Sequence, residues 1–130
     1  QTGVPLIGTN PDCANNVAGR FMPENGAQLA ALRAASGIHE DKVVIVGKPS
    51  PQLAETLMKK WSLERSRTIM VGDRLDTDVA FANRAGIASA LVLSGVSTLE
   101  QAEAAQNGAN AEMSPTYIVK TLLSLISGNG

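Results

Sequence analysis

Apolar, β-branched runs alternate with helical patterns along this chain, and this alternation constrains its fold more than any other feature of the sequence. The clearest runs are KVVIVG at 42–47, TIMVG at 68–72 and SALVLSG at 89–95. Strands that are apolar on both faces and separated by helices occur in parallel sheets that helices cover on both sides. The sequence therefore predicts an α/β fold that contains part of a doubly wound, Rossmann-like parallel sheet.

The segments before, between and after these runs carry signals for helices and for one further strand. Ser50 and Pro51 form a typical capped helix start, so we expect a helix directly after them. A short apolar run predicts a strand at 4–9, and the Asn, Pro and Gly content of 11–26 predicts a loop. Helical spacing predicts further helices at 27–36, 76–85, 99–105 and 117–126.

Composition limits the kinds of partner and compartment. The chain has 130 residues, and 11 Lys and Arg against 12 Asp and Glu give a formal net charge of -1. A nearly neutral chain has no general basic field for nucleic acid or an anionic membrane, and no apolar run reaches membrane-spanning length. The single cysteine, Cys13, excludes an internal disulfide framework and favours a reducing, cytoplasmic compartment. Because the chain begins at Gln1 rather than at Met, we expect it to be a piece of a longer protein.

Three carboxylates follow the expected strand at 68–72, in the stretch VGDRLDTD. Ligands of parallel α/β sheets bind beyond the carboxyl ends of the strands, and Asp73 stands at such an end. Asp73 can bind a hard cation directly, and Asp78 can support the metal site from the second layer of contacts. Asp76 suits the N-cap of the next helix. The alternative is that all three are cap and turn residues around a solvated helix start.

A lysine follows the preceding strand. Lys48 stands in VIVGKPSP, between a strand and a helix start, where its ammonium can neutralise a phosphate. The alternative is an ordinary solvated surface lysine. Because Lys48 and Asp73 follow successive parallel strands, they are expected to converge at one edge of the sheet. A lysine-held phosphate beside a carboxylate-bound Mg²⁺ is a recurring arrangement in phosphoryl transfer.

The motifs GKPSP, MVGDRLDTD, ANRAG and LVLSGVS, with LIGTNPD upstream, resemble the haloacid dehalogenase superfamily of phosphatases. The most similar branch contains 4-nitrophenylphosphatase, phosphoglycolate phosphatase and pyridoxal phosphate phosphatase. The resemblance implies Mg²⁺-dependent hydrolysis of phosphate monoesters through an aspartyl-phosphate. It also implies that Lys48 stabilises the phosphoryl group, that Asp73 is the Mg²⁺ ligand, and that Asp78 is the acidic residue supporting the metal.

The D-x-D motif that carries the nucleophile in this family has no match near the start of the chain. By the resemblance, residues 1–42 are the end of an α/β cap domain and residues 43–130 the second half of the core. The cap loop helps to choose the substrate in the family, with Asn15 or Asn16 nearest to it. The expected partners are a small phosphorylated metabolite and either the missing N-terminal half or a second copy.

A second class of function stays open, namely a non-catalytic phospho-binding or receiver-like regulatory domain. Receiver domains have their acidic pair near the N-terminus and their lysine later, whereas here Lys48 precedes Asp73. The order of the residues therefore favours the phosphatase.

Overall fold

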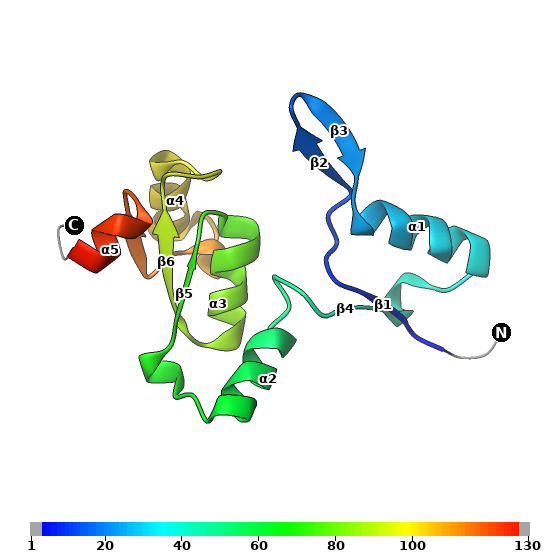
Figure 1. The fold of residues 1–130 in the computed structure, drawn as a ribbon, viewed down its shortest axis with the longest axis horizontal. Coiled ribbons are helices and arrows are strands. Elements are labelled where there is room, and N and C mark those ends of the chain that lie inside the picture. The colour runs from blue at the N-terminus through cyan, green and yellow to red at the C-terminus, as the bar shows by residue number, and fades with distance from the viewer. Residues whose placement is uncertain (1–3, 128–130) are drawn as a thin grey trace. The chain divides into compact units, whose positions relative to one another are not determined.

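The computed structural model describes residues 4–127 and divides into two compact units, Gln1–Gly47 and Lys48–Gly130 (Figure 1). We refer to them as the N-terminal and the C-terminal unit. The expected strand at 42–47 falls in the N-terminal unit, although it was grouped by sequence with the segments that follow it.

In the N-terminal unit a short parallel sheet lies beside one long helix. Strand β1 (Leu6–Gly8) pairs with β4 (Val43–Ile45), and the helix is α1 (Asn25–Ser36). Helix α1 ends at Gly37, which has the left-handed conformation that glycine adopts without strain. A 3-10 turn, η1 (Glu40–Lys42), leads into β4.

The segment expected as a loop at 11–26 contains a β-hairpin, so that prediction was wrong. Strands β2 (Ala14–Val17) and β3 (Arg20–Pro23) pair in antiparallel fashion. Ala18 and Gly19 join them, both with positive φ, 52° and 78°. Positive φ at both central residues matches the tight turn that suits the twist of a hairpin.

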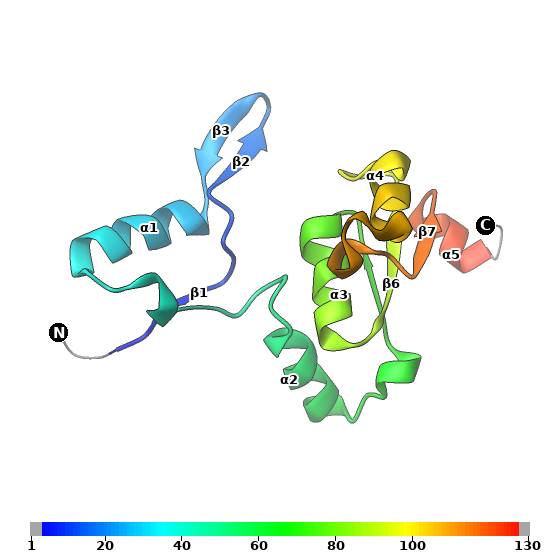
Figure 2. The same cartoon turned by 180° about the vertical axis from the view of Figure 1, so that it is seen from behind.

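The C-terminal unit is built on a three-stranded parallel sheet in the order β5-β6-β7 (Figures 1 and 2). Its strands are β5 (Ile69–Gly72), β6 (Ala88–Val92) and β7 (Tyr117–Val119). Its helices are α2 (Gln52–Trp61), α3 (Ala80–Ala85), α4 (Leu99–Ala104) and α5 (Leu122–Ser127). Shorter helical turns are η2 (Arg65–Arg67), η3 (Leu75–Val79), η4 (Ala105–Ala109) and η5 (Ala111–Met113).

Burial along β6 confirms the predicted fold class. Its successive residues Ser89, Ala90 and Leu91 are all almost completely buried. Because neighbouring side chains of a strand point to opposite faces, both faces of β6 are covered. One core cluster joins α2 and α3, and the other joins η3, β6 and α4.

Two sequence-based expectations about element ends were wrong. Tyr117–Val119, read as the start of a helix, is a strand whose residues pair with Ala90–Val92 of β6. Ser50 was expected to cap α2, but the N-cap is Pro51, and the Ser50 hydroxyl is hydrogen-bonded to the side-chain oxygen of Gln52.

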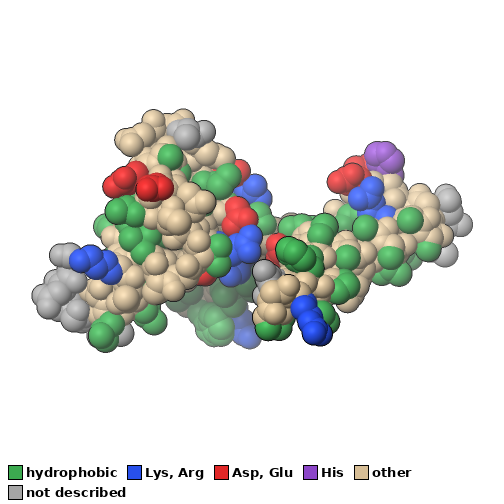
Figure 3. Space-filling model, turned by 90° about the horizontal axis from the view of Figure 1, so that it is seen from above, with side chains coloured by type: hydrophobic (Ala, Val, Ile, Leu, Met, Phe, Trp, Pro, Cys, Tyr) green, Lys and Arg blue, Asp and Glu red, His purple; other side chains and the backbone are tan. Residues whose placement is uncertain are grey.

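Within residues 4–127, no helix combines the length and the apolar character needed to cross a membrane. Large hydrophobic side chains are exposed on the surface of both units, as Figure 3 shows.

Candidate functional site

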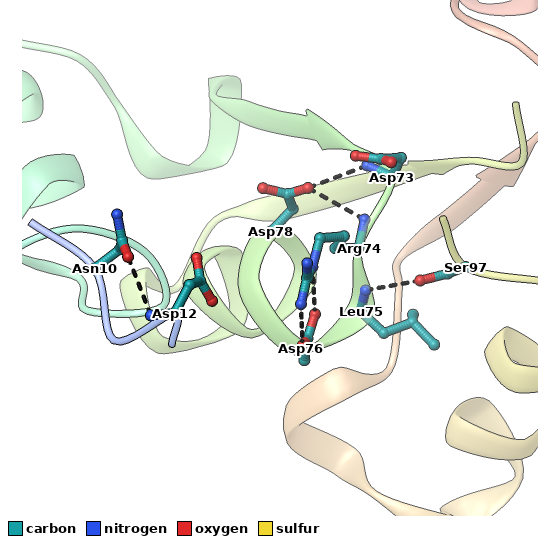
Figure 4. Close-up of polar contacts among 8 residues, drawn as sticks. All are labelled: Asn10, Asp12, Asp73, Arg74, Leu75, Asp76, Asp78 and Ser97. Carbon is teal, nitrogen blue, oxygen red and sulfur yellow. Dashed lines mark hydrogen bonds and ion pairs between the residues drawn. The ribbon is translucent and has the colours of Figure 1, made fainter. Parts of the chain in front are cut away.

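The buried carboxylate of Asp78 holds the loop that follows β5 in the C-terminal unit. Only 3% of the residue is exposed. Its Oδ2 accepts hydrogen bonds from the backbone N–H groups of Asp73, at 3.1 Å, and of Arg74, at 3.2 Å (Figure 4). Its Oδ1 lies 2.5 Å from Nζ of Lys48. One side chain thus joins the loop that follows β5 to the residue that leads into α2.

The local backbone explains how Asp78 reaches this position. Residues Leu75–Val79 form a π-helical turn, in which the N–H of Val79 bonds to the carbonyl of Arg74 at 3.1 Å. This wide turn places the Asp78 side chain against Gly72, the last residue of β5. Such turns occur often at functional sites. A Cβ at Gly72 would overlap the Asp78 carboxylate, so the approach requires a glycine there.

Asp73 is held by the loop that follows β6. Its Oδ2 accepts the backbone N–H of Val96 at 2.9 Å, and its carbonyl accepts the N–H of Ser97 at 3.0 Å. No hydrogen bond reaches Oδ1 from any residue that the structure describes. Asp73 is half-buried, so this oxygen can accept a bond from a ligand.

The Lys48 side chain is paired with a carboxylate and is also partly exposed to solvent. Its ammonium is paired with Asp78, yet 44% of its side chain is exposed. An ammonium has three donors, so those beyond the pair can reach an anion in solvent. The structure therefore brings Lys48 and Asp73 into contact with the same carboxylate, that of Asp78. The predicted reason, convergence at one edge of a single sheet, was wrong, because β4 before Lys48 pairs with β1 and β5 before Asp73 belongs to another sheet.

Asp76 does not have the predicted role of a helix N-cap. It lies inside η3, whose N-cap is Arg74, and its carboxylate pairs with the Arg74 guanidinium at 3.0 and 2.7 Å. The guanidinium lowers the pKa of Asp76, with partial burial acting in the opposite direction. Asp76 thus belongs to an exposed ion pair and not to the cluster around Asp78 (Figure 4).

The residues present fit one part of a magnesium site. Among residues 4–127, no group of three or more His, Cys, Asp or Glu side chains is arranged to hold a metal ion. Hard cations take about six oxygen ligands, many of which are water for Mg²⁺. Asp73 can supply one of these oxygens through Oδ1, and further ligands have to come from water, substrate or residues outside the described part.

The remaining candidates lie in the N-terminal unit. Asn15 is an exposed residue of β2, and the side chain of Asn16 is outside the described part of the structure. Cys13 is a free, exposed thiol. The ring of His39 lies 2.7 Å from Asp41, and both are exposed, as expected for a surface histidine.

Sequence reasoning missed the contribution of Val96 and Ser97. A backbone N–H donor leaves no signature in the residue type, so Val96 could not be found from the sequence. The hydroxyl of Ser97 accepts the N–H of Leu75 at 3.1 Å. The only available signal was the short polar stretch after the strand at 89–95.

Comparison with protein families gives a match to the family described as HAD-hydrolase-like, over residues 45–125. Among individual relatives, mouse (Mus musculus) chronophin is 38% identical over 124 residues, which are 95% of this chain and 41% of that protein. The glycerol-3-phosphate phosphatase of Gallus gallus is 36% identical, over 93% of this chain and 39% of that protein. The chain thus spans about two fifths of the length of these relatives.

Solved structures agree with this result. The 4-nitrophenylphosphatase of Thermotoga maritima superposes with a TM-score of 0.75 and 36% identity, over 93% of this chain and 43% of that chain. A glycerol phosphate phosphatase of Mycobacterium tuberculosis, solved in complex with magnesium, has a TM-score of 0.76 and 35% identity, over 93% of this chain and 34% of that one. A receiver-like regulatory domain gains no support from these similarities.

Proposed function

The chain belongs to the HAD-hydrolase-like family, and from this premise we propose that it is the C-terminal part of a Mg²⁺-dependent phosphatase acting on small phosphate monoesters. The relatives named as phosphatases support the reaction type, and the magnesium complex of one of them supports the choice of ion. The expected cytoplasmic location is part of this proposal and rests on the lone Cys13.

The observation that carries the proposal is the shared contact of Lys48 and Asp73 with the buried Asp78. In the proposed site the Lys48 ammonium neutralises charge on the phosphoryl group, and Asp73 is a ligand of Mg²⁺. Asp78 positions both without touching the substrate. When bound, Mg²⁺ would neutralise phosphate oxygens as a Lewis acid. The attacking carboxylate belongs to a part of the protein outside this chain.

We propose that residues 1–42, within the N-terminal unit, are the end of the cap domain and that Asn15 of its hairpin is a candidate substrate contact. The hairpin residues whose burial is described are exposed, which suits a surface that meets another molecule. The proposed partners are a small phosphorylated metabolite, and the N-terminal half of the protein or a second copy of the chain.

The test is a hydrolysis assay with the full-length protein. Glycerol 3-phosphate, phosphoglycolate, pyridoxal phosphate and 4-nitrophenyl phosphate are supplied with and without Mg²⁺, and released phosphate is measured. We expect Mg²⁺-dependent hydrolysis of at least one ester, and its loss in the Asp73→Asn variant, because a carboxylate ligand is removed from a hard cation.

Asp76→Asn is the matched control, since Asp76 stands in the same stretch but pairs with Arg74 at the surface. This variant should retain activity. Absence of hydrolysis of every ester by the unmodified protein, or an Asp73→Asn variant as active as the Asp76→Asn control, would contradict the proposal.

A further inference from the structure

We propose that residues 95–97, from the loop after β6, preset the carboxylate of Asp73 for cation binding, with Gly95 and the backbone of Val96 as positioning elements. This inference rests on the proposed function, because it concerns the same metal ligand. It assigns a role to a segment that contributes no ligand itself.

Asp73 is fixed at three of its own atoms. Its N–H donates to Oδ2 of Asp78 at 3.1 Å, and its carbonyl accepts the N–H of Ser97 at 3.0 Å. Its carboxylate Oδ2 accepts the N–H of Val96 at 2.9 Å. The backbone bonds fix where the residue stands, and the bond from Val96 fixes the rotamer of the side chain. Of the two carboxylate oxygens, Oδ1 is therefore the one left to bind a cation.

Gly95 sets how closely the two loops approach. A Cβ at this position would overlap the Cβ and the carboxylate group of Asp73. The side chain of Asp73 is short and its Cβ is attached directly to the backbone, so it cannot swing aside while keeping the bond to Val96. The glycine is thus required by the placement of Asp73, since Gly95 itself is not among the residues with positive φ.

Ser97 also joins the loop after β5 to the loop after β6. It is a largely buried residue, and its hydroxyl accepts the N–H of Leu75 at 3.1 Å. Together with the bonds of Asp73, this contact attaches residues 95–97 to residues 73–75 at three points. The loop after β5 is therefore held by the loop after β6 as well as by Asp78.

Groups that orient a metal ligand influence affinity without touching the metal. Loss of such an outer contact typically lowers metal affinity by about 10- to 100-fold. A ligand whose rotamer is already fixed also loses less conformational freedom when the cation binds. Residues 95–97 should therefore act on cation affinity first and on substrate affinity only indirectly.

The experiment measures Mn²⁺ binding to the full-length protein without substrate, by electron paramagnetic resonance of the free ion. Gly95→Ala displaces the Asp73 carboxylate by steric overlap, and Val96→Pro removes the N–H donor by a different route. Both should weaken Mn²⁺ binding by about 10- to 100-fold. Ser94→Ala, an exposed neighbour, is the control and should bind as the unmodified protein does.

Circular dichroism spectra and melting temperatures show which variants are folded, and either Gly95→Ala or Val96→Pro is sufficient if the other does not fold. Folded Gly95→Ala and Val96→Pro variants with unchanged Mn²⁺ affinity, alongside an Asp73→Asn variant that has lost it, would overturn this inference alone. An Asp73→Asn variant with unchanged affinity would overturn the proposed role of Asp73, and this inference with it.

Discussion

The buried carboxylate of Asp78 allows a test that separates its charge from its shape. In Asp78→Ala, the amides of Asp73 and Arg74 lose their acceptor and Lys48 loses its partner. Hydrogen bonds to a charged group contribute about 1.5–3 kcal/mol each. Both amides are only partly buried, so the lower end applies and the two bonds together give about 3 kcal/mol. The half-exposed ion pair adds at most about 1 kcal/mol.

In Asp78→Asn, the amide oxygen can still accept both backbone bonds, and the amide nitrogen replaces Oδ1 opposite the Lys48 ammonium. Two donors then face each other, so the ion pair is lost while the loop is kept. We expect this variant to be destabilised by about 1–2 kcal/mol, against about 3–4 kcal/mol for Asp78→Ala. Both variants should hydrolyse phosphate esters more slowly, because Lys48 is no longer positioned.

Two measurements on the full-length protein check this expectation. Urea unfolding gives the free energies, and hydrogen exchange followed by NMR reports directly on the amides of Asp73 and Arg74. These amides should stay protected in Asp78→Asn and exchange faster in Asp78→Ala. Equal stability of the two variants, or amides that remain protected in Asp78→Ala, would refute the argument that Asp78 holds the loop through its oxygens.

Three further predictions follow from the same contacts. Lys48→Ala should lower turnover at least 100-fold, which is roughly the effect of losing one preorganised electrostatic group. The same change should alter the free energy of unfolding by less than about 1 kcal/mol. Lys59→Ala, an exposed control on α2, should leave turnover unchanged in the same assays. Arg74 lowers the pKa of Asp76, so their pair stabilises the fold above the ordinary aspartate pKa of about 3.9 and loses this effect as the pH falls further. Between about pH 6 and pH 3, urea unfolding of Asp76→Asn should therefore show a smaller loss of stability than the unmodified protein. The isolated chain should self-associate in light scattering, since one edge of β5 has no strand partner in the described sheet; a stable monomer would contradict this.

Local patterns predicted most elements of the fold, and the errors arose where the pairing is not local. The hairpin at 14–23 was missed because its turn residues, Ala18 and Gly19, lack the Asn-Gly or Asp-Gly signal. Tyr117–Val119 was read as helix because its apolar residues continue the spacing of the helix that follows. It is a strand because it lies beside Ala90–Val92, which the sequence alone does not reveal.

The approach of Lys48 and Asp73 was predicted, but the sheet topology from which it was predicted was wrong. That Lys48 and Asp73 approach one another was inferred from their places after two successive strands, although the strand before Lys48 pairs in the N-terminal unit. The link between them could not be inferred, because it depends on the π-helical turn that places Asp78 between them. For the same reason Asp76 was assigned a capping role, since an ordinary helix start would have placed it first.

All the contacts that join the proposed catalytic residues lie within the C-terminal unit, of which Lys48 is the first residue. The lysine is held by Asp78 and the metal ligand by Val96, so neither needs the N-terminal unit to keep its position. Under the proposed function, changes in the hairpin should alter which ester is bound while the residues that act on its phosphate stay as they are. Such a division would allow one phosphate-binding arrangement to serve different substrates.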